Sequence, residues 1–311
     1  MKILVTGSSG FLGNSIRHHL ISEGYDTYGT TRSRPPEDEK EFQFDIVKDS
    51  CVQTFKEIEF DVIIHTIGLT DDSTPYRILK QTNVEGTKKI LEYAKTFNCK
   101  HFIHLSSVSV YGLKTLGQNP SEDSLKIRPH SLFFKYGRTK AQAEIDVLNA
   151  GLSYTVLRLP LMIGKGDKMV TPKLIELINN DQVYFLGKGK NLISVMPVEN
   201  LSVLISNLIE NGALNQSLHA PSYHIPLDSF VREHSTLANL PLQIRKGSIT
   251  SYRPNLPNIM KILLFYSWKG SYFPDLKIRS LLPEYQDVVS WKTSLRKIVK
   301  PLSVYEILSF R

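Results

Sequence analysis

The chain has 311 residues, of which 41% are hydrophobic, and its 38 Lys and Arg against 30 Asp and Glu give a net charge of +8. This length permits a substantial core, in one large domain or in two closely joined lobes. No apolar run is long enough to span a bilayer, and the apolar residues 1–5 lead directly into a Thr-Gly-Ser turn, so we expect neither stable membrane insertion nor a secretory signal.

Buried strands alternate with helical patterns through the first half of the chain, which indicates βαβ units and a parallel sheet. We predict strands at 2–6, 27–31, 41–44, 62–66, 101–106 and 154–158, and helices at 11–22, 50–58, 76–97 and 136–150. Gly24 and Gly151 follow two of these helices, where glycine commonly ends a helix. Beyond Arg158 the alternation loosens, with helices at about 171–180 and 198–210.

These elements predict a Rossmann-type α/β fold, a doubly wound parallel sheet with a smaller C-terminal substrate lobe. We assign residues 1–160 to a dinucleotide-binding domain and residues 161–190 and 216–311 to a substrate-binding lobe. We expect residues 191–215 to pack back onto the first domain.

A glycine-rich loop lies between the first predicted strand and the first helix, in the sequence Thr6-Gly7-Ser8-Ser9-Gly10-Phe11-Leu12-Gly13. This is the context that a dinucleotide fingerprint requires. Glycine lets the amides at the helix N-terminus approach a pyrophosphate closely. We therefore predict cofactor contacts at Gly7, Ser9, Gly10, Phe11, Leu12 and Gly13.

The end of the second strand indicates which dinucleotide is bound. An acidic residue there accepts the ribose 2′-hydroxyl of NAD, whereas an arginine accommodates the 2′-phosphate of NADP. Residues 28–34 contain no carboxylate, and Arg32 lies there with Ser33 and Arg34 as helpers, so we predict NADP in preference to NAD. Asp45 either caps the adenine amino group or only begins the next helix. Thr31, Ile46 and Thr66 complete the predicted cofactor-binding set.

Tyr136 and Lys140 lie four residues apart in a predicted helix and therefore share one face. We expect the Lys140 ammonium to favour the phenolate and so to lower the pKa of Tyr136 from its ordinary value. A tyrosine placed in this way transfers a proton to or from a carbonyl or hydroxyl near neutral pH. The pair follows Ser107 and the sequence Val110-Tyr111-Gly112.

The chain resembles the extended short-chain dehydrogenase/reductase family, which contains nucleotide-sugar epimerases, dehydratases and reductases. The resemblance implies that Tyr136 is the acid/base, that Ser107 holds the reacting oxygen, and that Lys140 binds the nicotinamide ribose while tuning Tyr136. It is specific over residues 1–160 and extends to about residue 240. The motifs that carry it are the Gly7/Gly10/Gly13 loop, Asp61-Val62-Ile63-Ile64-His65, Asn83-Val84-Glu85-Gly86-Thr87, and Ser107 with Val110-Tyr111-Gly112 before Tyr136 and Lys140.

Three departures narrow what the resemblance implies. Dehydratases of the family carry an Asp-Glu pair directly after the catalytic Ser or Thr, where this chain has Val108 and Ser109, so we expect no dehydration. Residues 67–68 replace the family's usual small pair and alter the nicotinamide wall. Residues 191–197 lack an arginine that many sugar-nucleotide members carry there, which weakens the argument for a nucleotide-sugar substrate.

The remaining composition excludes other kinds of site. No basic block is interleaved with aromatic residues, so we expect no nucleic-acid partner despite the positive charge. None of the nine histidines has a helical ligand spacing with a carboxylate partner, so we predict no metal. Cys51 and Cys99 lie far apart and form neither a metal spacing nor a disulfide framework, which predicts a cytoplasmic protein.

The leading interpretation is an NADP(H)-dependent oxidoreductase that acts on a ketone or secondary alcohol of a sugar nucleotide or a similar small molecule. The same residues suit an NAD(P)-dependent sugar-nucleotide epimerase, which oxidises and re-reduces its substrate with the cofactor retained. An alternative of another class is a non-catalytic NADP(H)-binding regulatory or assembly subunit.

The helix expected at 76–97 also suggests an assembly. Relatives of the resembled family commonly pair this helix and the one at 136–150 across a two-fold axis. We therefore predict a homodimer with an isologous contact. The residues that give the first helix more apolar surface than one sheet contact needs are Ile78, Leu79, Ile90, Leu91 and Tyr93.

Overall fold

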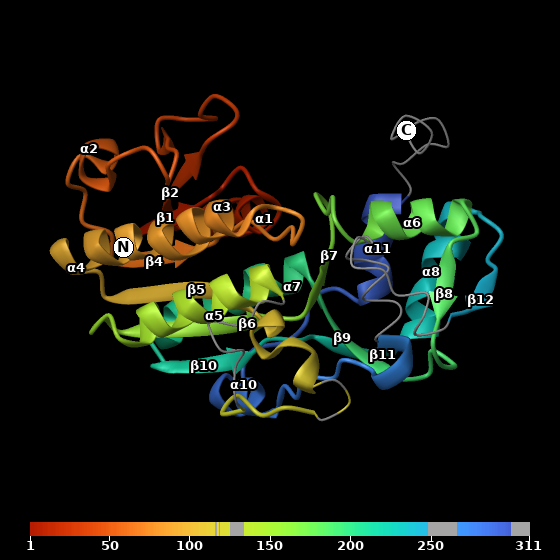
Figure 1. Cartoon of the computed structure of the whole chain (residues 1–311). Helices are drawn as coiled ribbons and strands as arrows, with labels where there is room; N and C mark the ends of the chain where they lie inside the picture. The colour runs from red at the N-terminus through yellow and green to blue at the C-terminus, as the bar shows by residue number, and fades with distance from the viewer. Residues whose placement is uncertain (116, 118, 125–133, 248–265, 300–311) are drawn as a thin grey trace.

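The computed structural model describes residues 1–115, 117, 119–124, 134–247 and 266–299. Within them the chain forms a large sheet joined to a smaller second lobe (Figure 1). The large sheet has seven strands in the order β10-β6-β5-β4-β1-β2-β3, and all neighbouring strands run parallel, which confirms the predicted Rossmann-type fold. The strands are β1 (Lys2–Thr6), β2 (Asp26–Thr31), β3 (Glu41–Gln43), β4 (Val62–His65), β5 (His101–Ser107), β6 (Tyr154–Leu159) and β10 (Gln216–His219).

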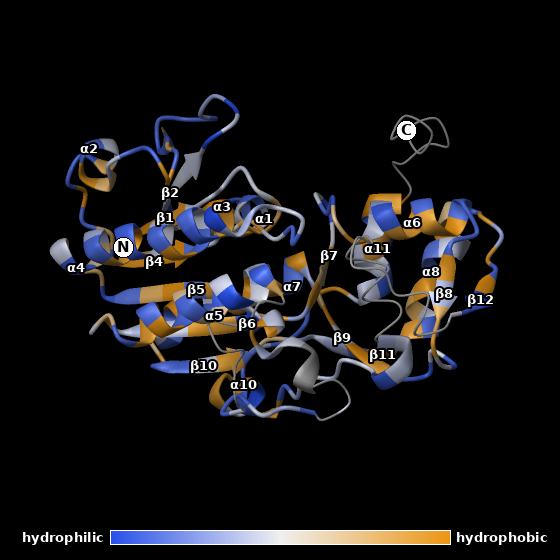
Figure 2. Cartoon of the chain, in the orientation of Figure 1, coloured by the Kyte–Doolittle hydropathy of each residue, from blue (hydrophilic) through white to orange (hydrophobic). Residues whose placement is uncertain are grey.

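The central strands are apolar on both sides, and the sheet is therefore buried on both faces. In β1, Ile3 and Val5 enter the core on one face, whereas Leu4 enters the core on the other. Figure 2 shows hydrophobic residues along the strands and on the helices that cover them. A parallel sheet of this kind is stable only when helices cover both of its faces.

Two sets of helices provide this cover (Figure 1). α7 packs on α1, where the hydroxyl oxygens of Ser15 and Ser202 lie 2.9 Å apart and His19 Nε2 lies 3.1 Å from Ser206 Oγ. One face carries α1 (Phe11–Ser22), α7 (Val198–Asn211) and α10 (Leu276–Leu281), and the other carries α2 (Cys51–Phe55), α4 (Gly86–Thr96) and α5 (Lys135–Leu148).

The second lobe has a core of its own. Its elements come from several parts of the chain after β6, because α7 and β10 return to the large sheet between them. The lobe contains a three-stranded sheet of β7 (Leu161–Ile163), β9 (Leu192–Pro197) and β11 (Tyr223–Pro226), a two-stranded sheet of β8 (Val183–Phe185) and β12 (Ile244–Lys246), and the helices α6 (Thr171–Asn179), α8 (Leu227–Ala238) and α11 (Trp291–Val299).

Two segments differ from the expected domain boundaries. β10 and α10, expected in the second lobe, belong to the large sheet, because β10 pairs with β6 and Ile278 of α10 shares a core with Leu218 of β10. β9, expected with the first domain, pairs with β7 and β11 instead. Residues 248–265 and 300–311 of the expected lobe lie outside the described residues.

The helix expected at 76–97 changes its winding part of the way along. It consists of α3 (Tyr76–Lys80), a π-helical turn η1 (Gln81–Glu85) and α4, in direct succession. π turns within helices are frequent at functional sites. A short 3₁₀ element, η2 (Val108–Thr115), follows β5 and was not predicted.

Most of the apolar residues that suggested a dimer surface are buried within the chain. Leu79, Ile90, Leu91 and Tyr93 are at most 5% exposed, and the last three lie in the core between α4 and the sheet. Of the five residues, Ile78 alone is exposed, at 44%. The apolar surplus of this helix is therefore used in intrachain packing, and that argument for a homodimer is wrong.

The described part of the chain also lacks certain features. No helix in it combines the length and apolar character needed to cross a bilayer. No three His, Cys, Asp or Glu side chains gather there as metal ligands. Cys51 and Cys99 are buried free thiols.

Candidate active site

The glycine loop joins β1 to α1 at the C-terminal edge of the large sheet. Gly7 has a φ of +74°, a conformation that favours glycine. A Cβ on Gly13 would lie 2.3 Å from the Gly7 carbonyl oxygen and 2.8 Å from Thr66 Oγ1, so a side chain does not fit there. Thr66 Oγ1 itself donates to the carbonyl oxygen of Thr6 at 2.7 Å. The loop is therefore held in close contact with the end of β4.

The outer side of this loop presents backbone groups to a ligand. Ser9 and Gly10 are exposed, and α1 begins at Phe11 without a side-chain cap. Amide groups at such a helix N-terminus bind a pyrophosphate. The six loop residues predicted as cofactor contacts lie together at this helix N-terminus, and their contact with a dinucleotide stays a prediction. These residues are Gly7, Ser9, Gly10, Phe11, Leu12 and Gly13.

Ile67 and Gly68, which follow β4, lie between the glycine loop and the candidate catalytic residues. A Cβ on Gly7 would lie 3.0 Å from Ile67 Cγ1, so the segment after β4 lies against the loop. A Cβ on Gly68 would lie 4.0 Å from Lys140 Nζ. Ile67 therefore lies against the glycine loop, and Gly68, the next residue, lies against the Lys140 amine.

A carboxylate that sequence reasoning missed lies beside the end of β2. Glu41 begins β3, and the pairing of the two strands sets it opposite Gly29. Its side chain is buried and accepts hydrogen bonds from Ser8 Oγ at 2.5 Å and from Arg34 at 2.6 and 3.0 Å. Burial raises the pKa of Glu41, but the bonds from Arg34 and Ser8 outweigh it and hold the pKa below its ordinary value. Glu41 is therefore ionised, and Arg34 neutralises it.

Arg32 is the cation at the end of β2 that remains exposed and, in the described part of the chain, makes no ion pair. Arg34, predicted as its helper, is engaged by Glu41 and lies 3.1 Å from Glu37. Thr31 is buried, and its hydroxyl donates to the Arg34 carbonyl oxygen at 3.1 Å, so it shapes the turn. Ser33 is exposed beside Arg32.

Asp45 and Ile46 follow β3. The Asp45 carboxylate accepts the N–H of Val47 at 2.9 Å, whereas Ser50 caps α2, so Asp45 does not begin that helix. Ile46 is 4% exposed and packs on the start of α4, where a Cβ on Gly86 would lie 2.8 Å from it. Asp45 is partly exposed, and Ile46 is a core residue.

Ser107 and Tyr136 come together where β5 ends and α5 begins. A hydrogen bond joins the Tyr136 phenol to Ser107, whose Oγ also accepts the Ser109 N–H at 3.1 Å. Burial raises the pKa of Tyr136 to about 12, against the effect of the Ser107 bond. The phenol is therefore protonated at neutral pH, which is the form that donates a proton to a carbonyl oxygen.

Lys140 lies one turn after Tyr136 and is 4% exposed. Its Nζ donates to the Leu105 carbonyl oxygen at 2.6 Å and lies 3.5 Å from His104 Nε2. Burial lowers the pKa of Lys140 to about 8, although Glu144 acts in the opposite direction. The expected lowering of the Tyr136 pKa by Lys140 is not met, because the ammonium is turned toward backbone and the burial of the phenol dominates.

Asn83 lies in the π turn η1 and holds α5 in place by hydrogen bonds. Its Nδ2 donates to Thr139 Oγ1 and to the Leu69 carbonyl oxygen, each at 2.9 Å, and its Oδ1 accepts the Leu69 N–H at 2.8 Å. Asn83 therefore joins the segment after β4 to the helix that carries Tyr136 and Lys140.

A buried ion pair behind the site was not foreseen from the sequence. Glu144 and Arg158 are at most 2% exposed, and Arg158 Nη2 donates to Glu144 Oε1 at 2.6 Å. Ser106 Oγ and Ser217 Oγ donate to the same carboxylate at 3.1 and 2.9 Å. The sequence offered one sign of this ion pair. Glu144 follows Lys140 by four residues, a spacing that puts both side chains on one helix face.

Tyr111 extends this network toward β10. It accepts a hydrogen bond from Arg158 Nη1, and its Oη lies 2.7 Å from His219 Nε2. Burial lowers the pKa of His219 to about 4, so the ring is neutral. The tyrosine of the Val110-Tyr111-Gly112 motif is therefore a buried structural link and is 1% exposed.

Comparison with known proteins places these motifs in a family. The model of the NAD dependent epimerase/dehydratase family matches residues 3–219. An undecaprenol-linked N-acetylglucosaminyl 4-epimerase of Escherichia coli is 26% identical over 226 residues, which cover 70% of this chain and 66% of that protein. A 2-alkyl-3-oxoalkanoate reductase of Stenotrophomonas maltophilia is 27% identical over 213 residues, which cover 65% and 63%. The matched region thus spans about two thirds of the length of these relatives.

Solved structures agree on the fold. UDP-glucuronic acid 4-epimerase of Bacillus cereus in complex with NAD superposes with a TM-score of 0.76 over 100% of this chain and 99% of that one, at 19% identity. The Bordetella bronchiseptica enzyme WbmH in complex with NAD⁺ gives a TM-score of 0.78 over 98% and 99%, at 16% identity. Both neighbours carry NAD, whereas the sequence of this chain predicts NADP.

We predict that Lys140→Met alters how the free energy of unfolding depends on pH. The pKa of Lys140 is about 8 in the fold and 10.5 ordinarily, so the unfolded chain binds more protons between these values. The free energy of unfolding of the wild type therefore rises with pH across this window, by at most about 3 kcal/mol from this group. The variant lacks that rise.

Urea unfolding of both proteins between pH 8 and pH 10.5 measures the difference. Lys173→Met, at an exposed lysine on α6, is the matched control and should keep the wild-type slope. Equal slopes in the wild type and Lys140→Met would contradict the prediction.

Proposed function

The chain belongs to the NAD-dependent epimerase/dehydratase family, and from this premise we propose that it is an NADP(H)-dependent oxidoreductase. Its substrate is a ketone or secondary alcohol of a sugar nucleotide or a similar small molecule. The observation that carries this proposal is the meeting of Ser107, Tyr136 and Lys140 beside the glycine loop. These side chains carry the proposal and the fold does not, because one fold serves many reactions.

The chain's own residues have separate tasks in such a reaction. The bound dinucleotide supplies or accepts the hydride. Ser107 holds the substrate oxygen beside the phenol, and Tyr136 gives its proton to that oxygen in reduction and takes one from it in oxidation. The buried amine of Lys140 binds the cofactor ribose by hydrogen bonding. The protonated state of Tyr136 suits the reduction of a ketone.

The charges near β2 support NADP(H) as the cofactor. Glu41, the carboxylate nearest this strand end, has both oxygens engaged by Ser8, Arg34 and the Glu37 N–H, so it is not free to accept a ribose hydroxyl. Arg32 stays exposed without an ion pair among the described residues. A guanidinium suits a phosphate better than it suits a neutral ribose.

A second candidate is a sugar-nucleotide epimerase that retains its cofactor. It is favoured by the relatives and structural neighbours, which include 4-epimerases, and by the NAD that the structural neighbours carry. Native mass spectrometry of the purified protein separates the two. Stoichiometric NAD that stays with the protein supports the epimerase, whereas exchangeable NADP(H) supports the oxidoreductase.

We predict that Tyr136→Phe loses turnover and keeps cofactor binding. The substitution removes only the proton-donating hydroxyl, so kcat should fall roughly 10²–10⁴-fold. NADPH consumption is measured against a panel of sugar-nucleotide, steroid and isoprenoid ketones. Tyr184→Phe, on β8 of the second lobe, is the matched control. Near-normal turnover in Tyr136→Phe, or no consumption of NADPH by the wild type across the panel, would overturn the proposal.

We predict that Arg32→Asp moves the cofactor preference toward NAD(H). The change replaces a cation that pairs with the 2′-phosphate by an acceptor for the ribose 2′-hydroxyl. The measurement is the ratio of kcat/KM for the two cofactors. Arg245→Asp, an exposed arginine on β12, controls for the change in net charge. An unchanged ratio in Arg32→Asp would mean that the phosphate is recognised elsewhere.

We predict a homodimer from the family resemblance, although the apolar residues of α4 do not supply its surface. Light scattering at micromolar concentration should give about twice the chain mass of 35.4 kDa. Ile78→Asp, at an exposed apolar residue of α3, tests whether this helix takes part in the dimer contact. A wild-type protein that is monomeric and active would contradict the homodimer prediction.

A further inference from the structure

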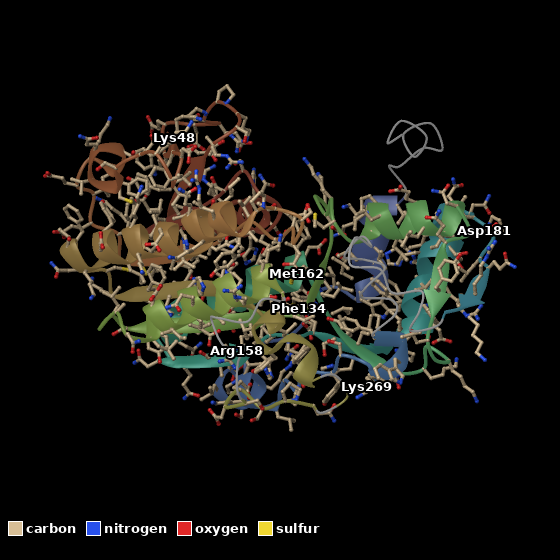
Figure 3. The ribbon with its side chains drawn as sticks, viewed as in Figure 1. Lys48, Phe134, Arg158, Met162, Asp181 and Lys269 are labelled. Atoms are coloured by element: carbon tan, nitrogen blue, oxygen red, sulfur yellow. The ribbon has the colours of Figure 1, made fainter. Side chains whose placement is uncertain are left out.

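The helix that carries Tyr136 begins without a cap of its own. Phe134, the residue before its first turn, has φ 58° and ψ 62°, in the left-handed region, and makes no side-chain cap bond. Figure 3 labels Phe134 where the large sheet meets the second lobe. A non-glycine residue keeps this conformation only where its surroundings hold it. The first amides of α5 therefore need acceptors from elsewhere in the chain.

The segment after β4 supplies such an acceptor. Asp72 Oδ1 accepts the backbone N–H of Tyr136 at 2.7 Å, across 64 residues of sequence. In the same segment, the carbonyl oxygen of Thr74 accepts Lys135 Nζ at 2.8 Å. Residues 71–76, which we call the capping loop, thus bind two consecutive residues at the start of α5. A carboxylate at a helix N-terminus also interacts favourably with the helix dipole.

Asp72 brings a negative charge to the phenol as well. After burial, which is the larger effect, the Asp72 charge raises the pKa of Tyr136, whereas the hydrogen bond to Ser107 lowers it. A nearby carboxylate disfavours a second negative charge. One side chain therefore both fixes the backbone of the candidate acid and disfavours the loss of its proton.

The cations around Tyr136 are turned toward other partners. Three of them lie on α5 itself, whereas β5 contributes the neutral His104 and η1 the neutral Asn83. Lys173 of α6 faces Asp71, where its charge, after the hydrogen bonds from Ser73, helps to lower the pKa of that carboxyl. Asp71, the neighbouring carboxylate, binds the N–H and hydroxyl of Ser73. Lys135 Nζ binds the Thr74 carbonyl oxygen, the Arg138 guanidinium lies 4.3 Å from the centre of the Tyr76 ring, and Lys140 Nζ binds the Leu105 carbonyl oxygen.

We propose that Asp72 is a positioning residue for Tyr136, whose carboxylate fixes the first turn of α5 and sets the electrostatic surroundings in which the phenol gives up its proton. The inference rests on the proposed function in one respect, that Tyr136 is the acid. The sequence carries no local sign of this contact, because the two residues belong to different βαβ units.

Nuclear magnetic resonance of ring-labelled tyrosine tests the inference without a substrate, with the Tyr136 signal assigned by its absence from Tyr136→Phe. In Asp72→Asn the amide oxygen still accepts the Tyr136 N–H, so the signal should titrate at a lower pH than in the wild type while amide exchange stays within about twofold. In Asp72→Ala the hydrogen bond is lost and the Tyr136 amide should exchange about fivefold faster. Asp71→Asn should match the wild type in both measurements.

Two results would overturn the inference. One is a Tyr136 titration in Asp72→Asn that coincides with those of the wild type and Asp71→Asn. The other is unchanged exchange of the Tyr136 amide in Asp72→Ala. Asp72→Ser, which keeps a hydroxyl acceptor without the charge, replaces Asp72→Asn if that variant does not fold. Turnover of Tyr136→Phe is a separate measurement, so a failure of the proposed function is distinguished from a failure of this inference.

Discussion

The buried ion pair between Glu144 and Arg158 is the interaction on which the geometry of the site depends. It joins α5 to β6, and hydroxyl groups of β5 and β10 donate to the same carboxylate. Removing either partner would leave an uncompensated charge in the core, at a cost of about 3–5 kcal/mol. α5 therefore cannot slide or rotate on the sheet without losing this pair, so Tyr136 stays beside Ser107 and Lys140 stays at the Leu105 carbonyl oxygen.

Burial acts in opposite directions on the two ionisable side chains that α5 carries into the site. It raises the pKa of Tyr136 and lowers that of Lys140, because a low-dielectric environment favours the neutral form of each group. The simple expectation from their spacing, an ammonium that stabilises a phenolate, describes a solvent-exposed helix. In the folded chain the phenol keeps its proton, which is the state that a ketone reductase requires before transfer.

Several charged side chains around β2 form ion pairs that neutralise their charges. Arg34 neutralises Glu41, and the buried Arg17 of α1 binds both oxygens of Asp38 at 2.7 and 2.8 Å, so ion pairs within the turn and with α1 hold the segment between β2 and β3. Arg32 is left facing outward. In the described part of the chain, these ion pairs leave Arg32 as an exposed cation of this stretch that no carboxylate neutralises.

The sequence by itself determined the elements whose signals are local. The glycine loop, the ends of β1 and α1, and the shared helix face of Tyr136 and Lys140 all follow from neighbouring residues, because backbone geometry and hydrophobic period act over a few positions. The tertiary structure alone decided that β10 joins the large sheet, that Glu41 lies beside β2, and that Asp72 caps α5. These contacts join segments far apart in the chain, and they depend on which distant surfaces bury each other best, a balance that no local pattern records.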